Sequence, residues 1–292
     1  MGRELAQVLP AARQVFEQAD EVLGTSLTRL MWEGPEDELT LTRNAQPAML
    51  VHSMAAHAVL KDRLGDAAFA AGHSLGEFSA HVAAGTLSFP DALRAVRRRG
   101  ELMFDAGASR AGTMAAVLGL SDEATRAACA AVTSGICVPA NYNSEGQIVI
   151  SGDRAGIEEG MAKAKEAGAK RVIELKVSGA FHSPLMAPAE EGLRALLEGV
   201  SFSDPVFPVV CNVTAEPVRS GSQARNLLVR QLTAPVLWSA SIETMVRAGA
   251  DRFLELGPGS VLCGLNKRNA KGAPCSSVGT PADAATWTGS PA

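Results

Sequence analysis

A serine between two glycines is the most specific chemical signal in this sequence. It lies in the pentapeptide Gly72-His73-Ser74-Leu75-Gly76, which matches the pattern G-x-S-x-G. Where a strand runs into a helix, this pattern places the serine on a sharp turn with its hydroxyl exposed. The start of the helix favours developing negative charge, and the backbone N–H of Leu75 is placed to donate to an oxyanion. The alternative is a chance match in a glycine-rich chain, but the strand–turn–helix context favours Ser74 as a nucleophile.

A serine nucleophile needs a base, and the chain holds five histidines. Four of them are poor candidates: His52, His57, His73 and His81. The first two lie in an apolar, helix-like stretch, the third adjoins the serine and diverges from its hydroxyl, and the last lies two turns down the following helix. His182 instead follows a predicted strand, in a loop expected at the carboxyl edge of the sheet, where Ser74 is also expected. His182 is therefore the favoured base.

Three consecutive arginines, 97–99, look at first like a solvated basic face. Helical spacing separates them, because Arg99 falls on an apolar stripe whereas Arg98 falls on the polar face. The stripe consists of Ala92, Ala95, Val96, Met103 and Ala106. A guanidinium on such a stripe keeps its charge and needs an anion. That anion is either a buried carboxylate of the protein or a substrate carboxylate held by two hydrogen bonds.

The elements that must position these residues alternate along the chain. A strand is expected at 67–71, just before Ser74, and a helix at 90–106 carries Arg99. Further helices are expected at 4–23, 47–64, 188–197, 222–232 and 239–248, and further strands at 206–211 and 252–255. This alternation indicates an α/β domain with a parallel sheet.

The region 110–178 has a different texture. Strands are expected at 113–118, 136–141, 147–151 and 171–177, and helices at 122–132 and 155–167. The order β-α-β-β-α-β is that of a ferredoxin-like unit. The expected fold is a hydrolase-like parallel-sheet domain, 1–109 and 179–280, with an inserted ferredoxin-like (α+β) subdomain at 110–178. Residues 281–292 belong to a stretch rich in small and polar residues and are expected to form a disordered tail.

Composition excludes several classes of protein. With 292 residues, of which 47% are apolar, the chain can bury a sizeable core. Its net charge of −4 argues against binding nucleic acid or an anionic membrane, and no run of 18 apolar residues is present. The five cysteines are scattered without a C-x-x-C pair, which argues against a metal site or a disulfide framework and fits a reducing cytosol. A cytoplasmic monomer is expected.

The segments that carry these residues resemble malonyl-CoA:acyl carrier protein transacylases of the bacterial type. Residues 72–80 resemble the active-site serine segment, and Arg99 falls where that family places its carboxylate-binding arginine. Residues 178–186 resemble the segment of the catalytic histidine, here His182. The stretch 229–232 resembles the one whose glutamine carbonyl orients that histidine, here Gln231. Segments 141–152 and 255–259 resemble a hairpin of the small subdomain and the last strand and turn.

This resemblance implies a double displacement in fatty acid biosynthesis. Ser74, with His182 as base, would take a malonyl group from malonyl-CoA as an ester. The phosphopantetheine thiol of acyl carrier protein would then take it from the serine. Both carriers are substrates, and no cofactor or metal is implied. The pair Phe181-His182 resembles the version of the motif that selects malonyl over branched acyl groups.

The sequence departs from the family pattern at the amino terminus. The family opens with a strand and a Gly-Gln-Gly-Ser-Gln loop, whose glutamine N–H is the second oxyanion donor, and Met1 aligns just after that loop. One rival interpretation is therefore a truncated, non-catalytic remnant that binds carrier protein or coenzyme A. A second rival is a serine thioester hydrolase, although Arg99 argues against a lipase. Weak candidates for docking an acidic carrier protein are Arg252, Lys267 and Arg268.

Overall fold

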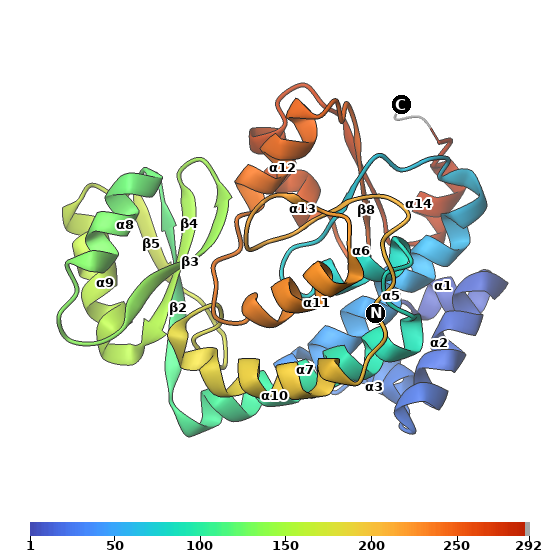
Figure 1. Cartoon of the computed structure of the whole chain (residues 1–292), viewed down its shortest axis with the longest axis horizontal. Helices are drawn as coiled ribbons and strands as arrows, with labels where there is room; N and C mark the ends of the chain where they lie inside the picture. The colour runs from blue at the N-terminus through green and yellow to red at the C-terminus, as the bar shows by residue number, and fades with distance from the viewer. Residues whose placement is uncertain (290–292) are drawn as a thin grey trace.

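Two short sheets with parallel strand pairs, surrounded by helices, form the larger part of the computed structural model, which describes residues 1–289 (Figure 1). Strand β1 (Ala70–Ala71) pairs in parallel with β6 (Val209–Val210), and β7 (Pro217–Val218) joins β6 in the antiparallel direction. Strands β8 (Phe253–Leu256) and β9 (Cys275–Val278) form a separate parallel pair. The one parallel sheet expected from the sequence is thus divided in two.

Helices supply most of the core of this body. Helix α5 (Thr42–Leu60) packs against α7 (Phe89–Ser109) and α2 (Pro10–Leu23), and α10 (Ala187–Glu198) lies against α7 (Figure 1). Fully buried apolar side chains join these helices, among them Phe16, Leu50, Val51, Leu93, Val96 and Leu193. The other helices of the body are α1 (Arg3–Val8), α3 (Leu27–Glu33), α4 (Glu36–Thr40), α6 (Gly76–Ala83), α11 (Gly221–Arg230), α12 (Trp238–Arg247), α13 (Val261–Asn269) and α14 (Pro281–Thr286). Short 3-10 turns span Lys61–Arg63 and Pro184–Met186.

Two helix boundaries differ from the sequence-based prediction. The helix expected at 4–23 is broken at Leu9, which is extended with φ −117° and ψ 111°. Pro10 explains the break, since a proline disfavours helical backbone at the residue before it and starts a new helix readily. Helix α5 begins at Thr42 and so includes Gln46, which lies one residue upstream of the predicted start at Pro47.

A four-stranded antiparallel sheet lies at one end of the long axis of the molecule (Figure 1). Its strand order is β3-β4-β2-β5, and two helices pack on it. In chain order its elements are β2 (Gly112–Leu118), α8 (Asp122–Ala130), β3 (Cys137–Ser144), β4 (Gln147–Asp153), α9 (Arg154–Glu166) and β5 (Arg171–Glu174). The buried side chains of Val117, Ile150 and Ile157 give this unit a core of its own.

The chain leaves the body for this unit and returns at nearly the same point. A Cβ atom built on Gly107, near the end of α7, would lie 2.3 Å from the carbonyl oxygen of Ser178, so the two crossing segments are in contact. A second link joins the unit to the body, because Tyr142 N–H donates to the carbonyl of Val236 at 2.9 Å.

The carboxyl-terminal region is more ordered than its composition suggested. Strand β9 pairs with β8, and α14 begins with a capping box between Thr280 and Asp283. The expectation of a disordered tail is therefore wrong for the segment that α14 occupies, whereas residues 290–292 lie outside the described residues. The composition was misleading because alanine favours a helix once a cap is present.

The expectation that the cysteines form no disulfide is also wrong. Cys263 and Cys275 are bonded, with their sulfur atoms 2.03 Å apart. Helix α13 and strand β9 bring their Cα atoms to 5.3 Å, a separation that a disulfide spans readily. Sequence spacing alone carried no signal of this pairing. Within residues 1–289, none of the helices combines the length and apolar character needed to cross a membrane.

Candidate active site

The predicted nucleophile lies on a tight turn between β1 and α6. A Cβ atom on Gly72 would lie 1.9 Å from the backbone of Gly76, so the turn has no room for a side chain there. A Cβ atom on Gly76 would meet nothing within 4 Å, which means that only the first glycine is needed for steric reasons. Ser74 has a φ of +50°, a strained value for a residue with a side chain. The turn thus holds Ser74 at the end of β1 under local strain.

Among the described residues, His182 is the only histidine whose ring forms a hydrogen bond with Ser74. Its Nε2 lies 2.8 Å from Ser74 Oγ. Its Nδ1 lies 2.8 Å from the carbonyl oxygen of Gln231 and 3.2 Å from that of Ala234. Because carbonyl oxygens only accept, Nδ1 carries the proton and Nε2 is free to accept one from the serine hydroxyl. His182 also has a positive φ, +56°, so both members of the pair are held on strained backbone.

Burial keeps His182 uncharged. Desolvation, helped by the nearby positive charge of Arg99, lowers the pKa of His182 to about 3. The imidazole is therefore in its basic form throughout the neutral pH range. The surroundings thus favour a neutral proton acceptor at the serine.

Arg99 reaches the serine from helix α7. Its side chain is only 1% exposed. It donates from Nη2 to Ser74 Oγ at 3.1 Å and to Gln231 Oε1 at 2.9 Å, and from Nη1 to Gln46 Oε1 at 2.5 Å. Its Nε–H is buried and has no acceptor within residues 1–289. Burial lowers the pKa of Arg99 to about 10, so the guanidinium still carries its charge at neutral pH.

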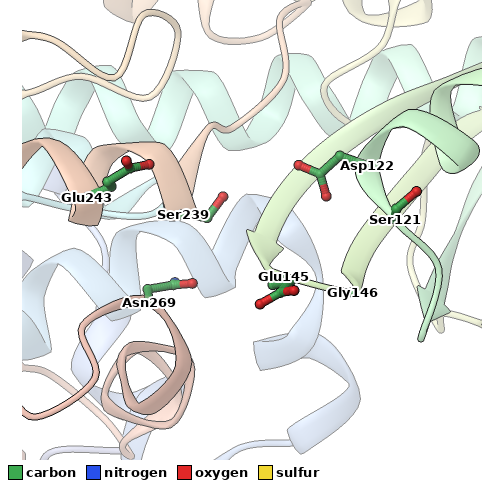
Figure 2. A pocket seen from close by; sticks show the side chains of 7 residues that line it. All are labelled: Ser121, Asp122, Glu145, Gly146, Ser239, Glu243 and Asn269. Carbon is green, nitrogen blue, oxygen red and sulfur yellow. The ribbon is translucent and has the colours of Figure 1, made fainter.

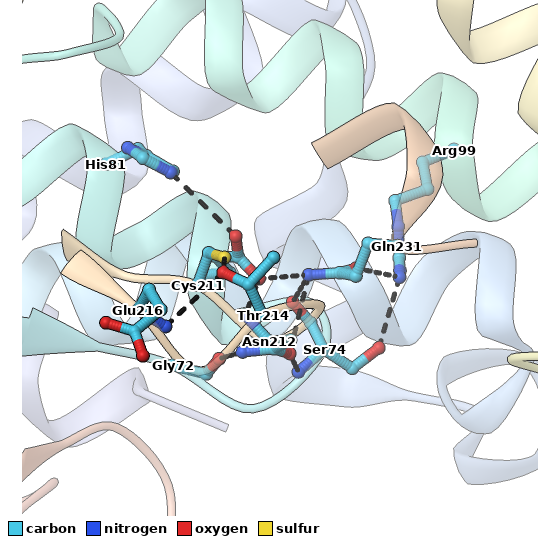
Figure 3. A network of polar contacts seen from close by, with 10 residues as sticks. Gly72, Ser74, His81, Arg99, Cys211, Asn212, Thr214, Glu216 and Gln231 are labelled. Carbon is cyan, nitrogen blue, oxygen red and sulfur yellow. Dashed lines mark hydrogen bonds and ion pairs between the residues drawn. The ribbon is translucent and has the colours of Figure 1, made fainter. Parts of the chain in front are cut away.

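A buried polar network lies beside the serine (Figure 3). Asn212, just after β6, accepts from the backbone N–H of Ser74 at 2.7 Å and donates to the carbonyl of Gly72 at 2.7 Å. The side chain of Gln231 donates to the carbonyl of Ser74 at 3.0 Å and to Glu77 Oε2 at 2.6 Å. Gln231 therefore contacts the serine, the histidine and the arginine with three different atoms. The sequence drew attention only to its backbone carbonyl.

The backbone N–H of Leu75 is the predicted hydrogen-bond donor to the oxyanion. Leu75 directly precedes α6, and its N–H donates to no acceptor in the part of the chain that the structure describes. The N–H is thus free to bind an oxyanion formed at Ser74. Among the same residues, no group of three or more histidine, cysteine, aspartate or glutamate side chains could hold a metal ion.

The remaining histidines have other surroundings. His73 Nε2 donates to Asn143 Oδ1 at 2.8 Å, and Asn143 O accepts from Asn269 at 2.8 Å, so the residue before the serine is tied to the hairpin of the small unit. His52 lies 2.8 Å from the carbonyl of Gly279. His81 is fully buried beside Glu77.

Three participants were not singled out from the sequence: Gln46, Glu77 and Asn212. Gln46 lies one residue before the predicted start of its helix at Pro47, and Glu77 was noted only as part of the segment around the serine. The pattern Gly-x-Ser-x-Gly-Glu places Glu77 on the first turn of the helix, pointing inward, which was the available signal for that residue. Nothing local marked Asn212, because its role depends on β6 pairing with β1.

A pocket of about 350 Å³ lies between the small unit and helices α12 and α13 (Figure 2). It is lined by Ser121, Asp122, Glu145, Gly146, Ser239, Glu243 and Asn269. Three carboxylates in its lining disfavour a ligand rich in phosphate, and neither Ser74 nor His182 reaches it. This pocket is therefore separate from the serine site.

The chain matches the model of the family described as "Acyl transferase domain" over residues 1–284. It is similar to the malonyl CoA-acyl carrier protein transacylase of Bacillus subtilis (strain 168), with 46% identity over 92% of this chain and 85% of that protein. It is also similar to the crystal structure of the transacylase from Xanthomonas oryzae, with a TM-score of 0.93, 41% identity and coverage of 98% and 91%. A third relative is a malonyl-transacylase solved in complex with a type II PKS acyl-carrier protein, with a TM-score of 0.93, 41% identity and coverage of 98% and 93%.

Proposed function

The chain belongs to the acyl transferase domain family, and from that premise we propose that it moves a malonyl group from coenzyme A to an acyl carrier protein. Relatives that share 41–46% of its residues are named for this reaction, and one of them was solved with its carrier protein. The observation that carries the proposal is the placement of Arg99 Nη2 only 3.1 Å from Ser74 Oγ. A buried cation at the nucleophile suits an acyl group that carries its own carboxylate.

In the first half-reaction, Ser74 Oγ attacks the thioester carbonyl of malonyl-CoA while His182 Nε2 takes its proton. The carbonyl of Gln231 holds the His182 tautomer that makes this transfer feasible. The oxyanion of the tetrahedral intermediate accepts from the backbone N–H of Leu75. Coenzyme A leaves as the thiol with that proton, and an ester remains on Ser74.

In the second half-reaction, the phosphopantetheine thiol of the carrier protein gives its proton to His182 and attacks the ester. The collapse of the second tetrahedral intermediate returns the proton to Ser74 and releases the malonyl thioester. One serine serves two large thiol carriers in turn, which is the usual reason for a covalent intermediate. No cofactor is required for either step.

Arg99 provides the selectivity in this scheme. Its Nε–H has no acceptor among the described residues, so a malonyl carboxylate can accept from it without displacing a protein group. An acetyl group would leave the same donor buried and unsatisfied, which is unfavourable. A thioester hydrolase would use the same serine and histidine, but the named relatives are transacylases. The hydrogen bond between Ser74 and His182 disfavours the other alternative, a non-catalytic remnant.

We infer the division of the chain from the same evidence. Residues 1–109 and 179–280 form the hydrolase-like acyltransferase domain, and 110–178 form an inserted unit with the strand order of a ferredoxin-like fold. For the carrier protein, Arg268 is the best placed of the three basic candidates. It lines a pocket of about 500 Å³ together with Lys170 and Arg171, where three cations face a single carboxylate, that of Glu145. Such a cation cluster suits an acidic carrier protein.

Mass spectrometry of the intact protein after incubation with malonyl-CoA tests the proposal. The wild-type protein should gain the mass of one malonyl group, and Ser74→Ala should gain none. Addition of phosphopantetheinylated carrier protein should remove the adduct from the enzyme and transfer it to the carrier. Loss of the adduct to water, at a rate that the carrier protein does not change, would support the hydrolase instead.

A further inference from the structure

Among residues 1–289, no carboxylate contacts the positively charged guanidinium of Arg99 directly. Its three hydrogen bonds go to amide and hydroxyl oxygens, on Gln46, Gln231 and Ser74. A buried charge normally has a counter-charge nearby, because desolvation otherwise makes it very unfavourable. We therefore expect the counter-charge on a carboxylate that is connected to the guanidinium through one of these hydrogen-bonded residues.

Glu77 is that group. Its side chain is 0% exposed, and its Oε2 accepts from Gln231 Nε2 at 2.6 Å and from the backbone N–H of Asn212 at 3.0 Å. Because Gln231 Oε1 accepts from Arg99, a single amide group connects the carboxylate to the guanidinium. Figure 3 shows Gln231 beside the guanidinium of Arg99 and close to Ser74, with His81 on the far side of the network. The other oxygen of Glu77, Oε1, has no hydrogen-bond partner among residues 1–289.

Resting on the proposed function, we propose that Glu77 is the resident counter-ion of Arg99 and takes up a proton when Ser74 is loaded with a carboxylated acyl group. Before loading, when Glu77 is ionised, the network contains one buried cation and one buried anion. A malonyl ester on Ser74 brings a second carboxylate to Arg99, which would leave two anions for one cation. Protonation of Glu77 restores the balance, and its unpartnered Oε1 is the position that can receive the proton.

The free protein is poised for this exchange. Burial raises the pKa of Glu77 to about 7, while its hydrogen bonds and the charge of Arg99 act in the opposite direction. Neutralising Arg99 with a malonyl carboxylate removes that opposing effect, so the pKa of Glu77 rises further. Glu77 therefore passes from partly ionised to protonated as the ester forms.

Other titratable groups near Glu77 do not account for such an uptake at neutral pH. His81, on the same helix, has no hydrogen-bond partner within the described range 1–289, and burial lowers its pKa to about 4. Burial raises the pKa of Cys211, next to β6, so it stays a thiol. His182, on the other side of Gln231, starts from a pKa of about 3 and would gain a proton only in acid.

The proton comes from solvent, and the acyl transfer itself does not consume one. The proton of Ser74 passes through His182 to the sulfur of coenzyme A, and this is the same for malonyl and acetyl groups. Any ionisation of the released thiol is also the same for both. The difference between the two acyl groups thus isolates the uptake at Glu77.

The experiment counts protons in weakly buffered solution with an indicator dye, without carrier protein, and measures the amount of Ser74 ester by mass spectrometry. Malonyl-CoA should give an uptake of about half a proton per ester at pH 7 and more at pH 8, because the free carboxyl is about half ionised at its pKa. Acetyl-CoA should give none beyond the thiol correction. Glu77→Gln should form the malonyl ester without the extra uptake, and the matched control His81→Phe should behave as the wild type.

Equal uptake for malonyl and acetyl, or uptake retained in Glu77→Gln, would overturn the inference. If Glu77→Gln does not fold, infrared difference spectra of the wild type serve instead, since a protonated carboxyl band should appear on malonyl loading and not on acetyl loading. Absence of that band, with the ester present, would also overturn it. Failure to form any ester would refute the proposed function, which is a different outcome.

Discussion

Replacing Arg99 by methionine is the sharpest test of how the site recognises its acyl group. Methionine keeps much of the volume on the apolar stripe of α7 but removes the charge and all hydrogen bonds of the guanidinium. We expect malonyl loading of Ser74 to fall much more than acetyl loading. The reason is that only the malonyl group has a carboxylate to accept from the vacant Nε–H of Arg99.

The magnitude follows from the surroundings of the guanidinium. Arg99 is 1% exposed, so solvent screens its contact with a carboxylate only weakly. Removing one partner of such a desolvated charge pair typically costs about 2–5 kcal/mol, or roughly 30-fold to several thousandfold in kcat/KM. Acetyl loading loses only the contact of Nη2 with Ser74 Oγ. A charged hydrogen bond of that kind contributes about 1.5–3 kcal/mol at most, and the removal of Arg99 also raises the pKa of His182, which strengthens the base.

The assay compares kcat/KM for loading from malonyl-CoA and acetyl-CoA in wild type, Arg99→Met and Arg99→Lys. The malonyl-to-acetyl ratio should fall by at least tenfold in Arg99→Met. It should fall by less in Arg99→Lys, which keeps the charge but not the planar fork. Melting temperatures of all three proteins control for loss of folding, because Glu77 loses its counter-charge in the methionine variant. An unchanged ratio would refute the assignment and make Arg99 a purely structural residue.

Three further outcomes follow from the contacts in the site. His182→Ala should slow formation of the Ser74 ester by two to four orders of magnitude, roughly the range for loss of a general base, as measured by quenched-flow mass spectrometry; a loss below tenfold would contradict its role. Gly72→Ala should lower the melting temperature sharply, whereas Gly76→Ala should leave it nearly unchanged, because only the first Cβ would collide with backbone. Folding raises the pKa of Glu77 from 4.5 to about 7, so its contribution to stability is complete below pH 4.5 and is lost as the pH rises to 7. In urea unfolding, the free energy of unfolding of Glu77→Gln relative to that of the wild type should therefore rise by about 2–3 kcal/mol between pH 5 and pH 8. A difference that stays constant with pH would contradict the raised pKa.

The sequence predicted the local features of this fold better than its long-range ones. The elements of 110–178 were located closely, since each lies between clear turn signals and pairs with near neighbours in the chain. The division of the expected parallel sheet was not foreseen, because the pairing of Ala70 with Val209 depends on segments far apart in the chain. The break at Leu9 follows from Pro10, whereas the hydrophobic period alone predicts one continuous helix.

The same contrast holds for the site. Ser74, His182 and Arg99 could be selected from motif, loop position and helical register. In the structure, Ser74 Oγ lies within hydrogen-bonding distance of both His182 and Arg99. The roles of Glu77 and Asn212 could not be selected in this way. Their importance depends on which buried oxygens and N–H groups need partners, and that is decided only when the strands and helices have packed.

The order in which the segments leave the ribosome has a consequence for how this site is assembled. The backbone of Ser74 is held by the side chains of Asn212 and Gln231, which are synthesised long after the serine itself. The four-stranded unit between them has its own core and local pairings, and both of its ends meet at Gly107 and Ser178. In nascent chains this unit should therefore fold first, and the apolar face of α7 should be buried only after α10 has been synthesised. Pulsed hydrogen exchange on chains stalled at increasing length should show protection of β2 and β4 before that of α7, and the reverse order would contradict this view.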